Sequence, residues 1–167
     1  MSTKVERNYL EINSLKDLKS PKFFPGDFFI DFNEPADFQI NKFFYKQIGK
    51  QHRWTDRLAW TDKQWIQYIS DKKVKTYILK RKKDLAGYFE LIFHKDRKET
   101  EIAYLGLLEE YQNKKLGAYL LSSAIENSFS ENIERVWVHT CSLDHKNALN
   151  NYISRGMKIF KKESVVI

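Results

Sequence analysis

The chain has 167 residues, of which 42% are hydrophobic and 15% aromatic, and its formal net charge is +7. This composition is too apolar for a disordered chain, and the length suits one hydrophobic core, so we expect a single domain over residues 1–167. No apolar run approaches the roughly 20 residues of a membrane-spanning helix, and residues 1–7 lack the apolar stretch of a signal peptide, so we expect a cytoplasmic protein without a membrane segment.

The N-terminal third contains a weak strand pattern and a clear helix pattern. Residues 8–14 predict a weak first strand, and the aromatic stretch 23–32, broken by Pro25-Gly26, predicts an extended arm or a hairpin. Pro35 suits the first position of a helix and Gly49 suits a helix stop. Between them apolar residues recur at every fourth position: Ala36, Ile40, Phe44 and Ile48.

A second helix and an antiparallel meander are predicted next. Residues 61–64, Thr-Asp-Lys-Gln, have the form of a capping box and precede a short amphipathic run. The loop 50–60 separates the two helices. Strand-like runs then follow, joined by charged turns, at 74–80, 85–93 and 100–108.

The last third predicts helix, strand, helix and strand in turn. From Lys114 the apolar period is helical, and residues 135–140 have the pattern of a buried strand. Asp144 suits the N-cap of a last helix, Gly156 suits the left-handed residue that ends it, and 157–167 supplies a final strand. The element order predicts a mixed α/β domain whose first half is predominantly antiparallel.

The segment 101–121 runs from a strand through a polar turn directly into a helix. Such a junction directs unpaired backbone N–H groups and the positive end of the helix dipole at one place, which suits a pyrophosphate. An ordinary strand-to-helix turn that is capped by side chains would show the same sequence pattern, so this segment alone does not identify a binding site. The chain contains neither GxxxxGK[ST] nor GxGxxG, which argues against ATP and NAD.

The turn itself, Tyr111 to Ala118 (YQNKKLGA), resembles the Q/R-x-x-G-x-G/A loop of the GCN5-related N-acetyltransferase (GNAT) family. Residues 136–160 are similar to the late strand, helix and strand of that family, with Ala148, Tyr152 and Gly156-Met157 in matching places. Residues 52–65 and 139–145 resemble segments of a subgroup of bacterial acetyltransferases. The resemblance covers roughly Trp54 to the C-terminus and implies a GNAT-like fold with a mostly antiparallel sheet flanked by helices.

The resemblance implies acetyl-CoA as cofactor, with its pyrophosphate on the loop amides. It places in the cofactor site Leu107, Leu108, Gln112, Asn113, Lys114, Lys115, Leu116, Gly117, Ala118, His145 and Asn147. Asn113 and Lys115 replace family glycines. Asn tolerates positive φ, whereas Lys115 has helical φ or is strained. Its ammonium group can instead contact phosphate, so we expect binding to survive.

The resemblance also implies catalytic roles. Tyr152 would protonate the leaving thiolate, although without the resemblance it would be interpreted as a core aromatic. The base that deprotonates the amine would be Glu101, with Glu90 and His139 as alternatives. A charged residue on a strand can equally be solvent-facing.

The loop 50–60 is the expected acceptor site, with Glu90 and His139 beside it. Trp54 and Trp60 offer apolar walls, Asp56 a partner for an ammonium group, and Arg57 a fork for a carboxylate or phosphate. This set predicts a small-molecule amine that also carries an anionic group, such as an amino acid. The alternative is that Asp56 and Arg57 pair with the scaffold while both tryptophans belong to the core.

Two other functions compete with an enzyme that transfers acetyl groups directly. One is a non-catalytic GNAT-fold module that binds acyl-CoA. The other, suggested by the pI near 9.3, is a nucleic-acid-binding surface of Lys72, Lys73, Lys75, Lys80, Arg81, Lys82 and Lys83 with Tyr77 and Tyr88. We expect no nucleic-acid partner, because no recognised motif accompanies the basic residues. The lone Cys141 and the lack of a zinc-ligand spacing predict neither a disulfide nor a metal, and both a monomer and a homodimer remain open.

Overall fold

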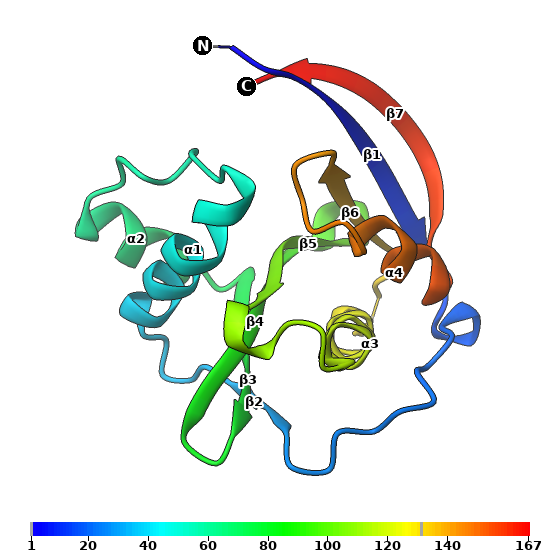
Figure 1. Ribbon diagram of the computed structural model, residues 1–167, viewed down its shortest axis with the longest axis horizontal. Helices are drawn as coiled ribbons and strands as arrows, with labels where there is room; N and C mark the ends of the chain where they lie inside the picture. The colour runs from blue at the N-terminus through cyan, green and yellow to red at the C-terminus, as the bar shows by residue number, and fades with distance from the viewer. Residues whose placement is uncertain (1, 131) are drawn as a thin grey trace.

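The computed structural model describes residues 2–130 and 132–167, and its centre is a seven-stranded mixed sheet (Figure 1). Adjacent strands are antiparallel, except that β5 and β6 run parallel. The strand order across the sheet is β2 (Phe29–Phe32), β3 (Val74–Arg81), β4 (Asp84–His94), β5 (Glu99–Leu107), β6 (Arg135–Cys141), β1 (Lys4–Ile12) and β7 (Lys158–Val166). The predicted α/β class with a mostly antiparallel sheet is therefore confirmed.

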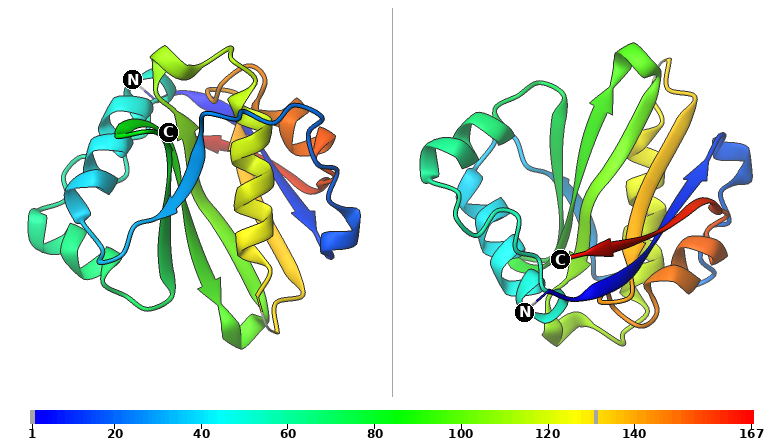
Figure 2. Two further views of the ribbon diagram at one scale, coloured as in Figure 1. Left: turned by 90° about the horizontal axis from the view of Figure 1, so that it is seen from below. Right: turned by 90° about the horizontal axis from the view of Figure 1, so that it is seen from above.

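Helices cover both faces of this sheet (Figures 1 and 2). Helices α1 (Phe38–His52) and α2 (Asp62–Ile69) lie against β3 and β4 on one face, and α3 (Leu116–Ser128) and α4 (Ala148–Ser154) lie on the other. Alternation along β4 serves both layers: Tyr88 packs with Phe44 of α1, whereas Phe89 joins the core under α3. Because successive strand residues face opposite sides, one strand supports two cores.

The sheet divides between β5 and β6. Their pairing is confined to Glu99–Glu101 with Arg135–Trp137, after which the two strands diverge. Tyr104 pairs with Glu90 and Ile102 with Leu91, so Ala103 is the extra residue of a bulge in β5 at the start of the divergence. Facing backbone groups of 103–107 and 138–141 are thereby left for a ligand.

Local signals located the start of α2 and the end of α4, whereas α1 continues past the predicted stop at Gly49 to His52. The capping box of α2 is present, with Thr61 and Gln64 bonded reciprocally. Gly156 has φ +104, and a Cβ there would lie 2.2 Å from the Asp17 carbonyl oxygen, so the predicted left-handed residue is confirmed. Helix α1 instead begins at Phe38 with Asp37 as its N-cap, because the Asp37 carboxylate accepts the Gln39 N–H.

The predicted N-cap of the last helix was wrong. Asp144 does not cap α4, because its carboxylate accepts from the Cys141 N–H at 3.0 Å and from the Thr140 hydroxyl, and α4 begins after Asn147. Of the two alternatives for the aromatic stretch 23–32, the hairpin is excluded, since only Phe29–Phe32 forms a strand, β2, at the edge of the sheet beside β3. Strand β1 starts at Lys4, earlier than the apolar pattern indicated. Among the described residues no helix has the length and apolar character needed to cross a membrane.

Candidate functional site

A cleft of about 700 Å³ occupies the space between the diverging strands β5 and β6. One end opens at the turn before α3 and along α4, and the other opens beside the loop between α1 and α2. Most of the predicted site residues line it: Trp54, Asp56, Arg57, Glu101, Leu107, Gln112, Asn113, Lys115, Leu116, Gly117, Ala118, His139, His145, Asn147 and Tyr152. Residues separated by nearly 100 positions in the sequence thus share one cavity.

The turn before α3 has the backbone of an anion-binding loop. Asn113 and Lys115 both adopt left-handed conformations, with φ of 62° and 63°. Lys115 is the N-cap of α3 and makes no side-chain cap hydrogen bond, so the first N–H groups of the helix remain free. Lys115 was expected to have either helical φ or a strained, positive φ, and the structure has the positive φ. The loop therefore keeps the backbone shape that glycine would give it.

Gly117 leaves room above this helix end. A Cβ at Gly117 would meet only the Asn151 Nδ2 atom, at 3.6 Å, which is an ordinary contact. Asn151 of α4 donates to the Gly117 carbonyl at 3.0 Å and so fixes α4 against α3. The free amides, the open surface and the positive end of the helix fit a pyrophosphate.

Three predicted residues lie outside the lining of the cleft. Leu108 is 8% exposed and packs beside Phe44 and Tyr88 in the core under α1. Lys114 is exposed, with its Nζ atom 5.9 Å from the centre of the Tyr111 ring. Glu90 is completely buried. The side chains of these three residues therefore do not form cleft walls.

Tyr152 lies on α4, is 7% exposed, belongs to the hydrophobic core under α3 and also lines the cleft. Burial, with a contribution from Asp144, raises the pKa of its phenol above the ordinary value. The group is therefore protonated at neutral pH and can donate a proton inside the cleft.

The three candidate bases have different surroundings. Glu101 lines the cleft and contacts the His94 Nε2 atom at 3.1 Å. His139 also lines the cleft, where desolvation by the walls and the nearby charge of Arg7 lower the pKa of its imidazole, so it is neutral at neutral pH. Glu90 has no access to the cleft, which leaves Glu101 and His139.

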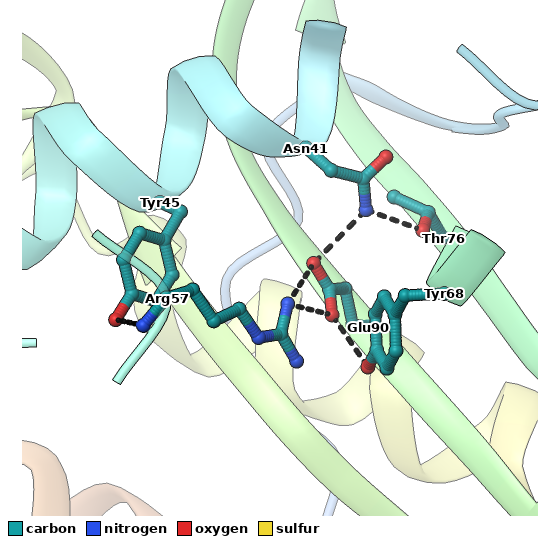
Figure 3. Close-up of polar contacts among 6 residues, drawn as sticks. All are labelled: Asn41, Tyr45, Arg57, Tyr68, Thr76 and Glu90. Carbon is teal, nitrogen blue, oxygen red and sulfur yellow. Dashed lines mark hydrogen bonds and ion pairs between the residues drawn. The ribbon is translucent and has the colours of Figure 1, made fainter. Parts of the chain in front are cut away.

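Glu90 is instead the centre of a buried polar cluster (Figure 3). Its carboxylate accepts from Arg57 NH1 at 3.0 and 3.3 Å, from the Tyr68 hydroxyl at 2.9 Å and from Asn41 Nδ2 at 2.9 Å. Burial opposes the charge on Arg57, but Glu90, Tyr68 and Tyr104 together outweigh it and raise the pKa of the guanidinium above its ordinary value. Arg57 therefore pairs with a residue of the sheet, which was the alternative to its binding a substrate anion.

The two tryptophans of the loop also separate. Trp54 lines the cleft and meets the Tyr104 ring edge-on, with centroids 4.8 Å apart. Trp60 packs against Trp65 and Tyr68 of α2, at centroid distances of 5.0 and 5.4 Å. Trp54 is therefore a wall of the cleft, and Trp60 belongs to the packing around Arg57.

A family model described as "Acetyltransferase (GNAT) family" matches residues 38–157. The chain belongs to this family. The matched range includes the divergence of β5 and β6, the turn before α3 and most of α4. None of the curated proteins compared with this GNAT chain matches it in sequence.

Solved structures share the GNAT fold with low sequence identity. A GCN5-related N-acetyltransferase from Kribbella flavida is 16% identical, with a TM-score of 0.68, over 99% of this chain and 58% of that one. A spermidine N-acetyltransferase from Vibrio cholerae, in complex with CoA and spermine, is 14% identical, with a TM-score of 0.62, over 84% and 96%. An aminoglycoside acetyltransferase from an uncultured soil metagenomic sample is 13% identical, with a TM-score of 0.65, over 78% and 88%.

The first structures in this comparison are longer than the GNAT chain described here, which spans 62%, 58% and 50% of their lengths. At these identities the likeness concerns the fold. The acceptor has to be inferred from the residues of the cleft.

Among the residues that sequence reasoning missed are His94 and Tyr104. His94 contacts Glu101 across neighbouring strands, and Tyr104 follows the bulge and lines the cleft. His94 could have been found only from the register of β4 and β5, because seven positions separate it from Glu101. Tyr104 stands in a run of aromatic and apolar strand residues whose pattern does not mark a bulge.

Proposed function

We propose that this chain transfers an acetyl group from acetyl-CoA directly to the amine of a small molecule while both are bound. The observation that carries the proposal is the cleft between β5 and β6, which joins the anion-binding turn before α3 to Glu101, His139 and Tyr152. The free amides of the turn would bind the pyrophosphate. The unpaired strand edges would bind the amide groups of the pantetheine arm.

The chain's own groups supply the proton transfers. Acetyl-CoA, as acyl donor, supplies the thioester carbonyl carbon to which the amine nitrogen bonds as the carbon–sulfur bond breaks. Glu101 takes the proton from the acceptor ammonium group before attack, and neutral His139 is the second candidate for this step. Tyr152 gives its phenolic proton to the departing sulfur. The nitrogen loses its second proton to solvent as the amide forms, Tyr152 regains a proton from solvent, and the base releases its proton there.

Cofactor binding is tested by a thermal shift with acetyl-CoA, CoA and an oligonucleotide in parallel. A ligand that binds only the folded state raises the unfolding midpoint, so acetyl-CoA and CoA should raise it and the oligonucleotide should not. Gly117→Val should abolish the CoA shift, because its methyl groups fill the space over the helix end. Gly26→Val is the matched control, since a Cβ at Gly26 has no atom within 4 Å. A folded Gly117→Val protein that binds CoA normally would contradict the placement of the pyrophosphate.

The features that suggested a nucleic-acid surface are dispersed. Lys72 and Lys73 precede β3, whereas Lys82 and Lys83 follow it, so the two groups lie at opposite ends of that strand. Tyr88 is completely buried and cannot stack on a base. These observations favour the acetyltransferase over the nucleic-acid alternative.

A further inference from the structure

We infer that the acceptor is a small compound with at least two amino groups, and that Asp56 binds the ammonium group that is not acetylated. The inference rests on the proposed function, because it concerns the acceptor end of the same cleft. It departs from the expectation that Arg57 selects a carboxylate or phosphate. The observation behind it is a contrast in pairing: Arg57 already has a carboxylate partner, whereas Asp56 at the same end of the cleft has no cationic partner among the described residues.

The positive charge of Arg57 is already balanced. Its NH1 group lies 3.0 and 3.3 Å from the two oxygens of Glu90, a carboxylate with no solvent exposure (Figure 3). A substrate anion would have to draw the guanidinium from Glu90 and leave a buried carboxylate unpaired, which is strongly unfavourable. The pair as a whole is neutral and attracts no anion.

Aromatic rings also enclose the Arg57 guanidinium. Its Cζ atom lies 4.1 Å from the centre of the Tyr68 ring, 4.4 Å from that of Tyr104 and 4.8 Å from that of Trp60. These contacts favour the position that Arg57 holds. Arg57 is therefore part of the cleft wall, and its charge is balanced within the protein by Glu90.

Two other arginines line the same end of the cleft and are also engaged. Arg7 lies 3.6 Å from Glu163 and 3.5 Å from the Tyr9 hydroxyl. Arg53 donates to the Thr3 hydroxyl at 3.0 Å. Arg7 is thus balanced by a carboxylate, whereas Arg53 bonds a hydroxyl just before β1 and has no carboxylate partner among residues 2–130 and 132–167.

The carboxylates at this end have fewer partners than Arg57 and Arg7. Asp56 is exposed, lines the cleft and has no ion-pair partner among residues 2–130 and 132–167. Glu101 has only His94 as a side-chain partner within the same residues. Asp56, Glu101 and His139 all line this one cleft. The cleft thus offers negative charge at two separate points.

Aromatic surface adjoins these carboxylates. Trp54 and Tyr104 meet edge-on at 4.8 Å, and both line the cleft. Ring faces attract ammonium groups, and rings also cover the methylene chain between two amines. One amine would then lie at Glu101, where it loses a proton and is acetylated, and the second would stay charged against Asp56.

The test uses three four-carbon amines that differ only at the far end: n-butylamine, 1,4-diaminobutane and 4-aminobutanoate. Thiol release from acetyl-CoA gives kcat/KM for each, and calorimetry gives the binding of each to the protein saturated with CoA. We expect 1,4-diaminobutane to exceed n-butylamine by about tenfold, the effect of one well-placed charge pair, and 4-aminobutanoate to be the poorest. A preference for 4-aminobutanoate, or equal values for all three, would overturn the inference.

Asp56→Asn tests the assigned residue. We expect it to reduce the ratio of kcat/KM between 1,4-diaminobutane and n-butylamine from about tenfold to near one. Asp27→Asn is the matched control, because Asp27 is exposed, lies outside the cleft lining and undergoes the same change of charge. An Asp56→Asn protein that keeps the full ratio would exclude Asp56 as the ammonium partner.

The two proposals fail in different ways. If CoA does not raise the unfolding midpoint, the proposed function is wrong and the inference falls with it. If CoA binds but none of the amines reacts or binds, the acceptor inference is wrong while the cofactor site stands. Thiol release that is fastest with 4-aminobutanoate would support the acetyltransferase and reject the diamine.

Discussion

Tyr152 is almost fully buried in the core and also lines the cleft. Replacing it with Phe removes the hydroxyl that we propose as the proton donor and keeps the ring that packs in the core. We expect Tyr152→Phe to lower kcat by roughly 10² to 10⁴, the usual range for a positioned acid, with little change in the KM for acetyl-CoA. Steady-state kinetics with chemistry rate-limiting measures this effect. An unchanged kcat would remove Tyr152 from the mechanism. A lower kcat that is fully explained by a smaller folded fraction of the protein would make Tyr152 a packing residue only.

Lys115 shows how the turn before α3 can adopt left-handed backbone without glycine. A left-handed conformation costs an ordinary residue about 1–2 kcal/mol, and Lys115 has φ 63°. Asn113 has φ 62° at a smaller cost, because its short side chain tolerates that region. The substitution that looks like a decayed motif in the sequence therefore preserves the loop.

Lys115→Gly should accordingly stabilise the protein. Relief of the strained φ exceeds the added entropy of the unfolded chain, and we expect a gain of about 0.5–1 kcal/mol, or roughly 2 °C in Tm. Lys114→Gly is the control, because Lys114 does not have positive φ and should lose stability. The midpoint from thermal unfolding decides between them. A lower midpoint for Lys115→Gly would mean that its side chain contributes more than the strain costs.

At the scale of elements, the Arg57–Glu90 pair joins four parts of the chain. Glu90 lies on β4, Arg57 on the loop after α1, Tyr68 on α2 and Asn41 on α1 (Figure 3). Buried ion pairs contribute little net stability over apolar residues, but removing one partner leaves an uncompensated charge. The pair therefore fixes how the helix pair and its loop sit on the sheet.

Glu90→Gln should be much more damaging than the loss of both charges together. We expect a loss of about 3–5 kcal/mol for Glu90→Gln and a smaller loss for the double variant Arg57→Met with Glu90→Leu. Urea unfolding measures both. Asp62→Asn, which breaks the exposed pair with Lys42 at 3.0 Å, should cost at most about 1 kcal/mol. Equal losses for the single and double variants would show that the hydrogen bonds, rather than the charges, matter here.

For the whole molecule, the sheet behaves as two halves joined at one end. Strands β2 to β5 form one half and β6, β1 and β7 form the other, with pairing between them limited to Glu99–Glu101 and Arg135–Trp137. Helix α3 packs across the first half and α4 packs on α3. A ligand between the strands would complete the missing part of the sheet.

The sequence could predict what depends on neighbouring residues. The capping box at Thr61 and the left-handed Gly156 need only local chemistry, and both are confirmed. The divergence of β5 and β6 depends on pairing between distant segments, and the burial of Arg57 depends on Glu90, 33 positions away. Asp144 illustrates the limit of a local signal, since an Asp near a helix can bind a strand end instead.

The two-halved sheet predicts a specific change in hydrogen exchange. Without ligand, amides on the free edges of 103–107 and 138–141 have no strand partner across the cleft and should exchange quickly. Saturation with acetyl-CoA should slow exchange there by about tenfold or more, because the ligand both bonds the edges and excludes water from the cleft. Amides of 76–79, already paired between β3 and β4, serve as the internal control and should change little. Unaltered exchange along both free edges at saturating acetyl-CoA would mean that the ligand does not lie between the strands, whereas slowing along 103–107 alone would mean that it contacts β5 without bridging to β6.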